Sequence, residues 1–186
     1  MSNRLFLKSV FGGISISIAS FIYLQTGGVI GAVLFSAGLL MILNLGFKLF
    51  TGTVGYFDSA DYVPSNVFIL LGNVSGCMAS LVFGHPEAQA LVAKKLATPL
   101  AMVFAKGGVC GVLIYAAVES FKRKKDYMVP FCVAGFILFG AEHCIADLCY
   151  FLSARMMTLH VVLFLLVVAL GNGVGAILTH MGSWEK

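Results

Sequence analysis

The stretch Gly140-Ala141-Glu142-His143-Cys144-Ile145-Ala146-Asp147 lies inside an apolar segment that begins near Met128 and resumes at Leu148. Two carboxylates and an imidazole so close together are costly in hydrocarbon, and ionisable residues at membrane depth usually face a cavity and mark a pathway. The pair Gly140-Ala141 also weakens the helix, as is typical where a spanning helix breaks to line a site. We therefore predict that this stretch is the middle of a pore.

The composition indicates an integral membrane protein. The chain has 186 residues, of which 60% are hydrophobic and 11% charged, with a mean hydropathy of +0.98. A soluble domain carries about a quarter charged residues, and each helical span needs about 20 apolar ones, so the chain has room for about six spans. We predict one all-α transmembrane domain over 1–186, with no enzymatic activity, no cofactor and no nucleic-acid partner; the lipid bilayer surrounds it.

Six spans can be placed along the chain. The first, over 5–24, follows Arg4 and Lys8 and is interpreted as a retained helix, because another membrane-length segment comes directly after it. The second starts near Val29 and is interrupted over 46–53, and the third covers 67–83. A loop over 84–93 precedes the fourth span at 96–118. The fifth starts near Met128 and breaks at the stretch 140–147, and the sixth covers 157–178.

The cationic residues predict the orientation. With six spans, the side that carries both termini collects most of them: Arg4, Lys8, Lys122, Arg123, Lys124, Lys125 and Lys186. The other side has Lys94, Lys95 and Arg155. Cytoplasmic loops are enriched in Lys and Arg, so both termini are predicted to be cytoplasmic.

The cysteines all fall in apolar segments: Cys77, Cys110, Cys132, Cys144 and Cys149. They form no C-x-x-C motif, and we interpret them as small buried helix residues rather than as a disulfide framework.

The two halves of the chain, about 1–84 and 94–180, have the same organisation. Each has a plain helix, a broken helix and a helix with the motif G-N-x-x-G, at 72–76 and at 171–175. Three spans repeated after three spans insert with opposite orientation, which is the inverted repeat of many channels and transporters. The structural alternative is that these glycines only mark a helix–helix contact.

These motifs together resemble the formate/nitrite transporter family. The stretch 49–53 (LFTGT) resembles its signature at the second, broken helix, and 140–147 resembles the signature Gly-x-Glu-His-x-x-Ala-Asn of the fifth. The Gly-Asn motifs and Lys95 match in position. The resemblance implies an aquaporin-like fold, a homopentamer with one pore per protomer in the bacterial inner membrane, and pH-dependent passage of small monovalent anions with protons.

The resemblance also implies roles for individual side chains. His143 is the central pore histidine, Thr51 its partner, Phe35 and Leu39 one hydrophobic constriction, Phe136 the other, Lys95 the vestibule lysine, and Asn73 and Asn172 the asparagines of the paired motifs.

The sequence departs from the family pattern at a few positions. Lys48 stands where an acidic residue is usual, Asp147 where asparagine is usual, and Gly111 where the fourth helix has asparagine. Lys106 is unusual in that helix, and the chain is short for the family. These departures bear on substrate and gating more than on fold.

The residue chemistry fits anion passage. An anion that crosses an apolar constriction loses its hydration at a cost of many kcal/mol. An imidazole, whose ordinary pKa is near 6.5, can donate a proton or a hydrogen bond there. A weak-acid anion would then pass as, or nearly as, a neutral species, with the Thr51 hydroxyl bonded to His143 or to the substrate.

Charges at the two breaks raise further hypotheses. Lys48 pairs with Asp147 or Glu142, which avoids an isolated buried charge, or it faces the pore and binds anions directly. Lys106 either extends toward the membrane surface or pairs with Glu142. His85, His160 and His180 lie in a loop or near span ends and are interpreted as structural.

Two other functions remain open at this point. His143, Cys144, Asp147 and Cys149 could hold a metal or haem in a membrane redox protein, since His143 and Asp147 share one helical face. No second His/Cys cluster completes such a site. The chain could instead conduct neutral solutes such as urea or water.

Overall fold

The computed structural model describes residues 3–58, 61–82 and 84–183, and within these ranges the chain forms helices and no strand. The helices are α1 (Asn3–Thr26), α2 (Gly28–Leu45), α3 (Phe50–Thr53), α4 (Tyr62–Cys77), the 3-10 helix η1 (Met78–Leu81), α5 (Pro86–Leu96), α6 (Leu100–Lys122), α7 (Met128–Phe139), α8 (Cys144–Ser153) and α9 (Leu159–Gly182). Phe83, at the end of the predicted third span, and Lys186, in the charge count above, lie outside the described residues.

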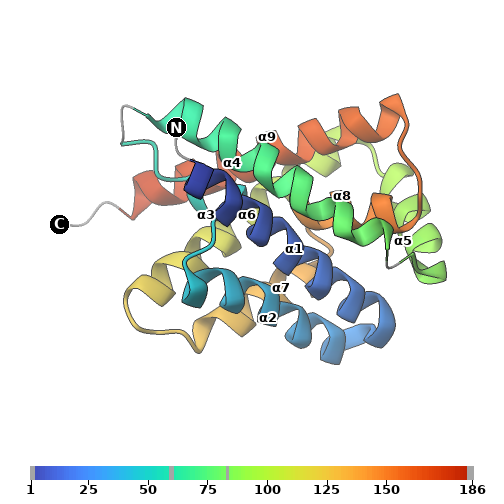
Figure 1. Ribbon diagram of the computed structural model, residues 1–186, viewed down its shortest axis with the longest axis horizontal. Coiled ribbons are helices and arrows are strands. Elements are labelled where there is room, and N and C mark those ends of the chain that lie inside the picture. Colours follow the sequence, from blue (N-terminus) through green and yellow to red (C-terminus); the bar gives the residue numbers. More distant parts are fainter. Residues whose placement is uncertain (1–2, 59–60, 83, 184–186) are drawn as a thin grey trace.

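The helices confirm an all-α membrane protein. α1, α2, α4 with η1, α6 and α9 are each long and apolar enough to cross a membrane. α7 and α8, which meet at an angle of 60°, give six spans when they are counted together as one. Large apolar side chains such as Ile30, Phe131 and Leu166 are exposed on the outside of the bundle, where a bilayer would cover them. Figure 1 shows the start of α1 and the end of α9 at the same end of the molecule, as an even number of spans requires, with α5 at the opposite end.

The predicted loop over 84–93 is wrong, because most of it is helix α5. His85 caps this helix by accepting a hydrogen bond on Nδ1 from the backbone N–H of Glu87, at 3.2 Å. Pro86, which suggested a loop, occupies the first helical turn, where its missing N–H costs nothing and its fixed φ favours the helix. Ala88 and Val92 are buried and fix this short helix against the bundle.

The two halves use glycine in the same way to bring helices together. α1 packs against α4, and α6 packs against α9. A Cβ atom at Gly76 of α4 would lie 2.1 Å from the Val10 carbonyl oxygen, and one at Gly175 of α9 would lie 2.0 Å from that of Gly108. The glycines of the paired G-N-x-x-G motifs therefore do mark close helix contacts, as in other membrane helix pairs.

The two broken spans also end alike. α2 stops at Gly46 (φ 67°, ψ 29°) and α7 at Gly140 (φ 74°, ψ 32°), both in the left-handed conformation that commonly ends helices. In each case the chain then runs extended before a second helix begins, after Leu49 and after His143 respectively. Both breaks predicted from the sequence are confirmed.

Candidate functional site

The break before α8 is held by one buried side chain, Asn172 of α9. Its Oδ1 accepts a hydrogen bond from the backbone N–H of Cys144 at 3.0 Å. Its Nδ2 donates to the carbonyl oxygens of Glu142 and Gly107, both at 2.8 Å. Backbone groups freed by a helix break need such partners in a membrane, because no water is present to satisfy them.

The break before α3 is held in the same way by Asn73 of α4. Its Oδ1 accepts from the Phe50 N–H at 2.8 Å, and its Nδ2 donates to the carbonyl oxygens of Lys48 at 2.8 Å and Ser9 at 2.7 Å. The contacted groups match those of Asn172: the first N–H of the second helix, the carbonyl two residues earlier, and a carbonyl of the neighbouring long helix. Both asparagines are fully buried.

His143 joins the two breaks. Its Nδ1 accepts a hydrogen bond from the Ala146 N–H at 3.1 Å, which caps the N-terminus of α8. Nδ1 therefore carries no proton, and the proton of the neutral ring is on Nε2. That N–H donates to Thr51 Oγ1 of α3 at 2.9 Å. The residue pair expected from the sequence is thus in contact, with His143 2% and Thr51 1% exposed.

Aromatic rings cover the imidazole. Phe136 of α7 stacks on His143 with centroids 5.7 Å apart, and Phe35 of α2 meets Phe136 edge-on at 6.0 Å. Phe35 and Phe136 are therefore neighbours, although the sequence analysis placed them in separate constrictions. Leu39, expected beside Phe35 in the same constriction, is buried and lines a cavity that Phe35 does not line.

Each of the two broken spans lines a cavity. The first, the histidine cavity, has a volume of about 410 Å³ and is lined by groups that include His143, Phe136 and Lys106. The second, the Lys48 cavity, has a volume of about 520 Å³. Polar or charged side chains that line the Lys48 cavity are Lys48, Thr53, Tyr56, Tyr62, Ser65, Asn66 and Lys122. His143 lines the histidine cavity, and Gly52 and Thr53, which follow Thr51 in α3, line the Lys48 cavity. The Thr51–His143 hydrogen bond therefore connects the elements that line the two cavities.

Lys95, at the end of α5, forms ion pairs with both acidic residues of the stretch 140–147. Its Nζ contacts Glu142 Oε2 and lies 2.8 Å from Asp147 Oδ1. Burial alone would lower the pKa of Lys95, but the charges of Asp147 and Glu142 raise it above its ordinary value. Lys95 is therefore a charge already compensated within the protein, and not a free cation at the mouth of a vestibule.

The predicted pair of Lys48 with Asp147 or Glu142 is wrong. Lys48 lines the Lys48 cavity, whereas both carboxylates line the histidine cavity. The cation that contacts Glu142 and Asp147 is Lys95. Lys106 lines the histidine cavity as well. Among the described residues it makes no ion pair, and only its carbonyl oxygen contacts Glu142, by accepting from the backbone N–H at 3.4 Å.

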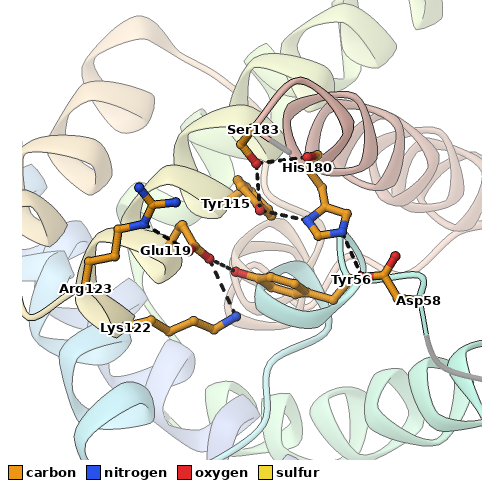
Figure 2. A network of polar contacts seen from close by, with 8 residues as sticks. All are labelled: Tyr56, Asp58, Tyr115, Glu119, Lys122, Arg123, His180 and Ser183. Carbon is orange, nitrogen blue, oxygen red and sulfur yellow. Dashed lines mark hydrogen bonds and ion pairs between the residues drawn. The ribbon is translucent and has the colours of Figure 1, made fainter. Parts of the chain in front are cut away.

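A polar network that the sequence analysis missed borders the Lys48 cavity (Figure 2). The Tyr56 hydroxyl donates to Glu119 at 3.0 Å, and the Lys122 ammonium lies 3.4 Å from the centre of the Tyr56 ring. Arg123 and Lys122 also approach the Glu119 carboxylate, at 3.2 and 3.7 Å. The available signal for this network was Glu119, a carboxylate directly after the predicted fourth span and one turn before the basic loop.

The same network ties down the end of α9. His180 contacts the Tyr115 hydroxyl through Nδ1 at 2.8 Å and Asp58 Oδ2 through Nε2 at 3.0 Å, as Figure 2 shows. Ser183 adds a contact to Tyr115 at 3.1 Å. These bonds connect α6 and α9 to the segment after α3.

The cysteines are buried, and none forms a disulfide in the described part of the chain. Cys149 and Cys77 place their sulfur atoms 3.2 Å apart. Within the same residues, no group of three or more His, Cys, Asp or Glu side chains is arranged to hold a metal ion. Both ring nitrogens of His143 already have hydrogen-bond partners, so His143 has no nitrogen free to act as a metal ligand.

Comparisons with known proteins agree with this architecture. The family model described as "Formate/nitrite transporter" matches residues 2–184. A solved structure described as "Pentameric formate channel with formate bound" is 22% identical, with a TM-score of 0.81 over 97% of this chain and 95% of that one. A structure described as "FNT family ion channel" is 19% identical, with a TM-score of 0.87 over 97% and 89%. No match was found among curated proteins.

Proposed function

The chain belongs to the formate/nitrite transporter family, and we propose that it passes small monovalent weak-acid anions, such as formate, nitrite or hydrosulfide, across a membrane in a pH-dependent way. The observation that supports this most directly is the Thr51–His143 hydrogen bond. Phe136 stacks on His143, and Phe35 meets Phe136 edge-on. A solved neighbour in fold is described as a pentamer with formate bound. We propose the same pentameric assembly here.

The aromatic rings set the barrier, and His143 lowers it. An anion that passes Phe35 and Phe136 loses most of its water, which is costly for a full charge. The Nε2–H of His143 is the one polar hydrogen that the ring can offer, because Nδ1 is held by the Ala146 N–H. By turning from Thr51 to the substrate, this N–H compensates part of the lost hydration.

Lysines in the two cavities concentrate the anion. Lys48 is half-buried and, among the described residues, has no ion pair, so it faces the Lys48 cavity as an uncompensated cation. Lys122 lines the same cavity, and Lys94 and Lys106 line the histidine cavity. Salt limits the reach of such charges to about 8 Å, so they act on anions that have already entered a cavity.

The surrounding charges suggest an orientation. We propose that both termini lie in the cytoplasm of a bacterial inner membrane, because basic residues gather at the start of α1 and between α6 and α7, and cytoplasmic loops are enriched in Lys and Arg. The Lys48 cavity then opens toward the cytoplasm, because Lys122 at the end of α6 lines it.

Flux into proteoliposomes tests the proposal. Formate, nitrite, hydrosulfide and urea are compared between about pH 5 and pH 8, a range over which the supply of protons to a weak-acid anion changes strongly. His143→Asn keeps a good N-cap for α8 but removes the Nε2–H. We expect anion flux that varies with pH and falls in this variant, while His160→Asn, at an exposed position, leaves it unchanged. Urea flux without anion flux, indifferent to His143, would contradict the proposal and favour a neutral-solute channel.

A further inference from the structure

The cluster around Lys95 contains one cation and two carboxyl groups. Glu142 and Asp147 are 2% and 1% exposed, and both contact the same ammonium nitrogen. The second oxygen of Asp147, Oδ2, is buried and has no hydrogen-bond partner. A buried carboxylate oxygen without a hydrogen-bond donor is costly, because its negative charge is not compensated. A proton bound to this oxygen would remove that charge.

The groups that surround Asp147 do not supply a second counter-ion in contact with it. The titratable groups on the elements packed around it are Tyr23 of α1, Lys94 and Lys95 of α5, Lys106 and Cys110 of α6, Glu142 and His143 at the break, and Cys144 and Tyr150 of α8. Lys94 and Lys106 make no ion pair in the described part of the chain. The Lys95 ammonium is thus the one cation bound to Asp147, and it is shared with Glu142.

Two ionised carboxylates beside one ammonium leave one negative charge uncompensated. Neighbouring carboxyl groups in a water-poor site share a proton instead of both ionising. The proton fits best on Asp147 Oδ2, because this oxygen lacks a donor and belongs to a residue that lines the histidine cavity.

We propose that Asp147 is a proton-binding site of the histidine cavity and the group that exchanges a proton with the passing weak-acid anion. The Oδ2–H bond breaks as the anion takes the proton and becomes the neutral acid, and the new Asp147 carboxylate is held by Lys95. The neutral acid passes Phe136 and His143 and releases its proton to water in the Lys48 cavity. Water in the histidine cavity then returns a proton to Asp147, so one proton crosses with each anion.

His143 is poorly suited to this step. Its Nδ1 lone pair accepts the Ala146 N–H, and loss of the Nε2 proton would leave an anionic ring. Asp147, one helical turn further along α8, can lose a proton while Lys95 stays in place. His143 then orients the substrate, and Asp147 supplies the proton. The proton site does not depend on the proposed function, whereas the exchange with a passing anion rests on it.

Infrared spectroscopy of the purified protein at neutral pH tests the proton site without any transport. We expect the C=O band of a protonated carboxylic acid, shifted when the aspartate side chains carry ¹³C and unshifted when glutamate is labelled. The band disappears in Asp147→Asn and remains in Asp126→Asn, which removes an exposed carboxylate. Absence of the band, or a shift with labelled glutamate, would overturn the assignment to Asp147.

A second measurement tests the exchange. Formate uptake driven by a pH gradient is recorded with a pH-sensitive dye inside the vesicles. A positioned acid contributes about 100-fold or more to a proton transfer, so Asp147→Asn should lower proton uptake with formate by about tenfold or more. Unchanged proton uptake would overturn the proposed exchange. If the infrared band is present but the wild type moves no anion, the proton site stands and the proposed transport function fails.

Discussion

Asn172 gives the strongest single test of how the broken span is held. The substitution Asn172→Leu keeps a similar size but removes three hydrogen bonds, to Cys144, Glu142 and Gly107. An unsatisfied buried polar group costs about 1–3 kcal/mol, so the three backbone groups together cost about 3–9 kcal/mol. Side-chain hydrogen bonds in membrane proteins average only about 0.6 kcal/mol, which gives a lower limit of about 2 kcal/mol for three.

The free energy of unfolding can be measured by titrating the protein with SDS in mixed micelles and following helix content by circular dichroism. Asn44→Leu is the matched control, because Asn44 is exposed and its side chain donates only to the Leu40 carbonyl of its own helix. We expect Asn172→Leu to lose at least about 2 kcal/mol. A loss no larger than that of Asn44→Leu would refute the conclusion that this asparagine satisfies the break.

Three further substitutions test other parts of the structure. Gly175→Ala is expected to destabilise by about 1–3 kcal/mol or more in the same titration, because its Cβ would meet a backbone oxygen at 2.0 Å. Gly182→Ala has open space and should change little. Lys95→Met leaves two buried carboxyl groups without their cation and should lose about 3–5 kcal/mol, whereas the exposed Lys94→Met should not. Thr51→Val removes the acceptor of the His143 N–H and should lower formate flux about fivefold, the equivalent of one hydrogen bond of about 1 kcal/mol. Thr51→Ser keeps the hydroxyl and should retain flux. Equal flux in both variants would argue against a role of the Thr51 hydroxyl in transport.

Much of the fold was accessible from the sequence because its determinants are local. Gly46 and Gly140 mark the two helix ends, and each lies beside polar residues in an apolar segment. The contact between Thr51 and His143 was expected from the family resemblance, and the structure has it. The positions of both breaks depend on where a helix ends, and short sequence patterns predict helix ends well.

The charges could not be paired from the sequence, because pairing depends on which cavity each side chain faces. Lys48 and Asp147 both lie near breaks, but in an inverted repeat the two breaks open to opposite sides. Lys95 reaches both carboxyl groups only because the segment after Pro86 is a helix, which the sequence analysis interpreted as a loop. One wrong local assignment thus concealed the charge cluster.

The two halves share a scaffold but not their chemistry. Leu49 and His143 occupy equivalent places: each is extended, precedes the second helix of a broken span, and follows a carbonyl held by an asparagine. The first half puts an apolar side chain there, and the second half puts an imidazole that caps a longer helix. Because glycines and asparagines present twice build both breaks, the position next to the break is free to vary. The proposed transport chemistry then depends on residues present once, so a substitution at His143 should alter flux at much smaller cost to the fold than one at Asn172.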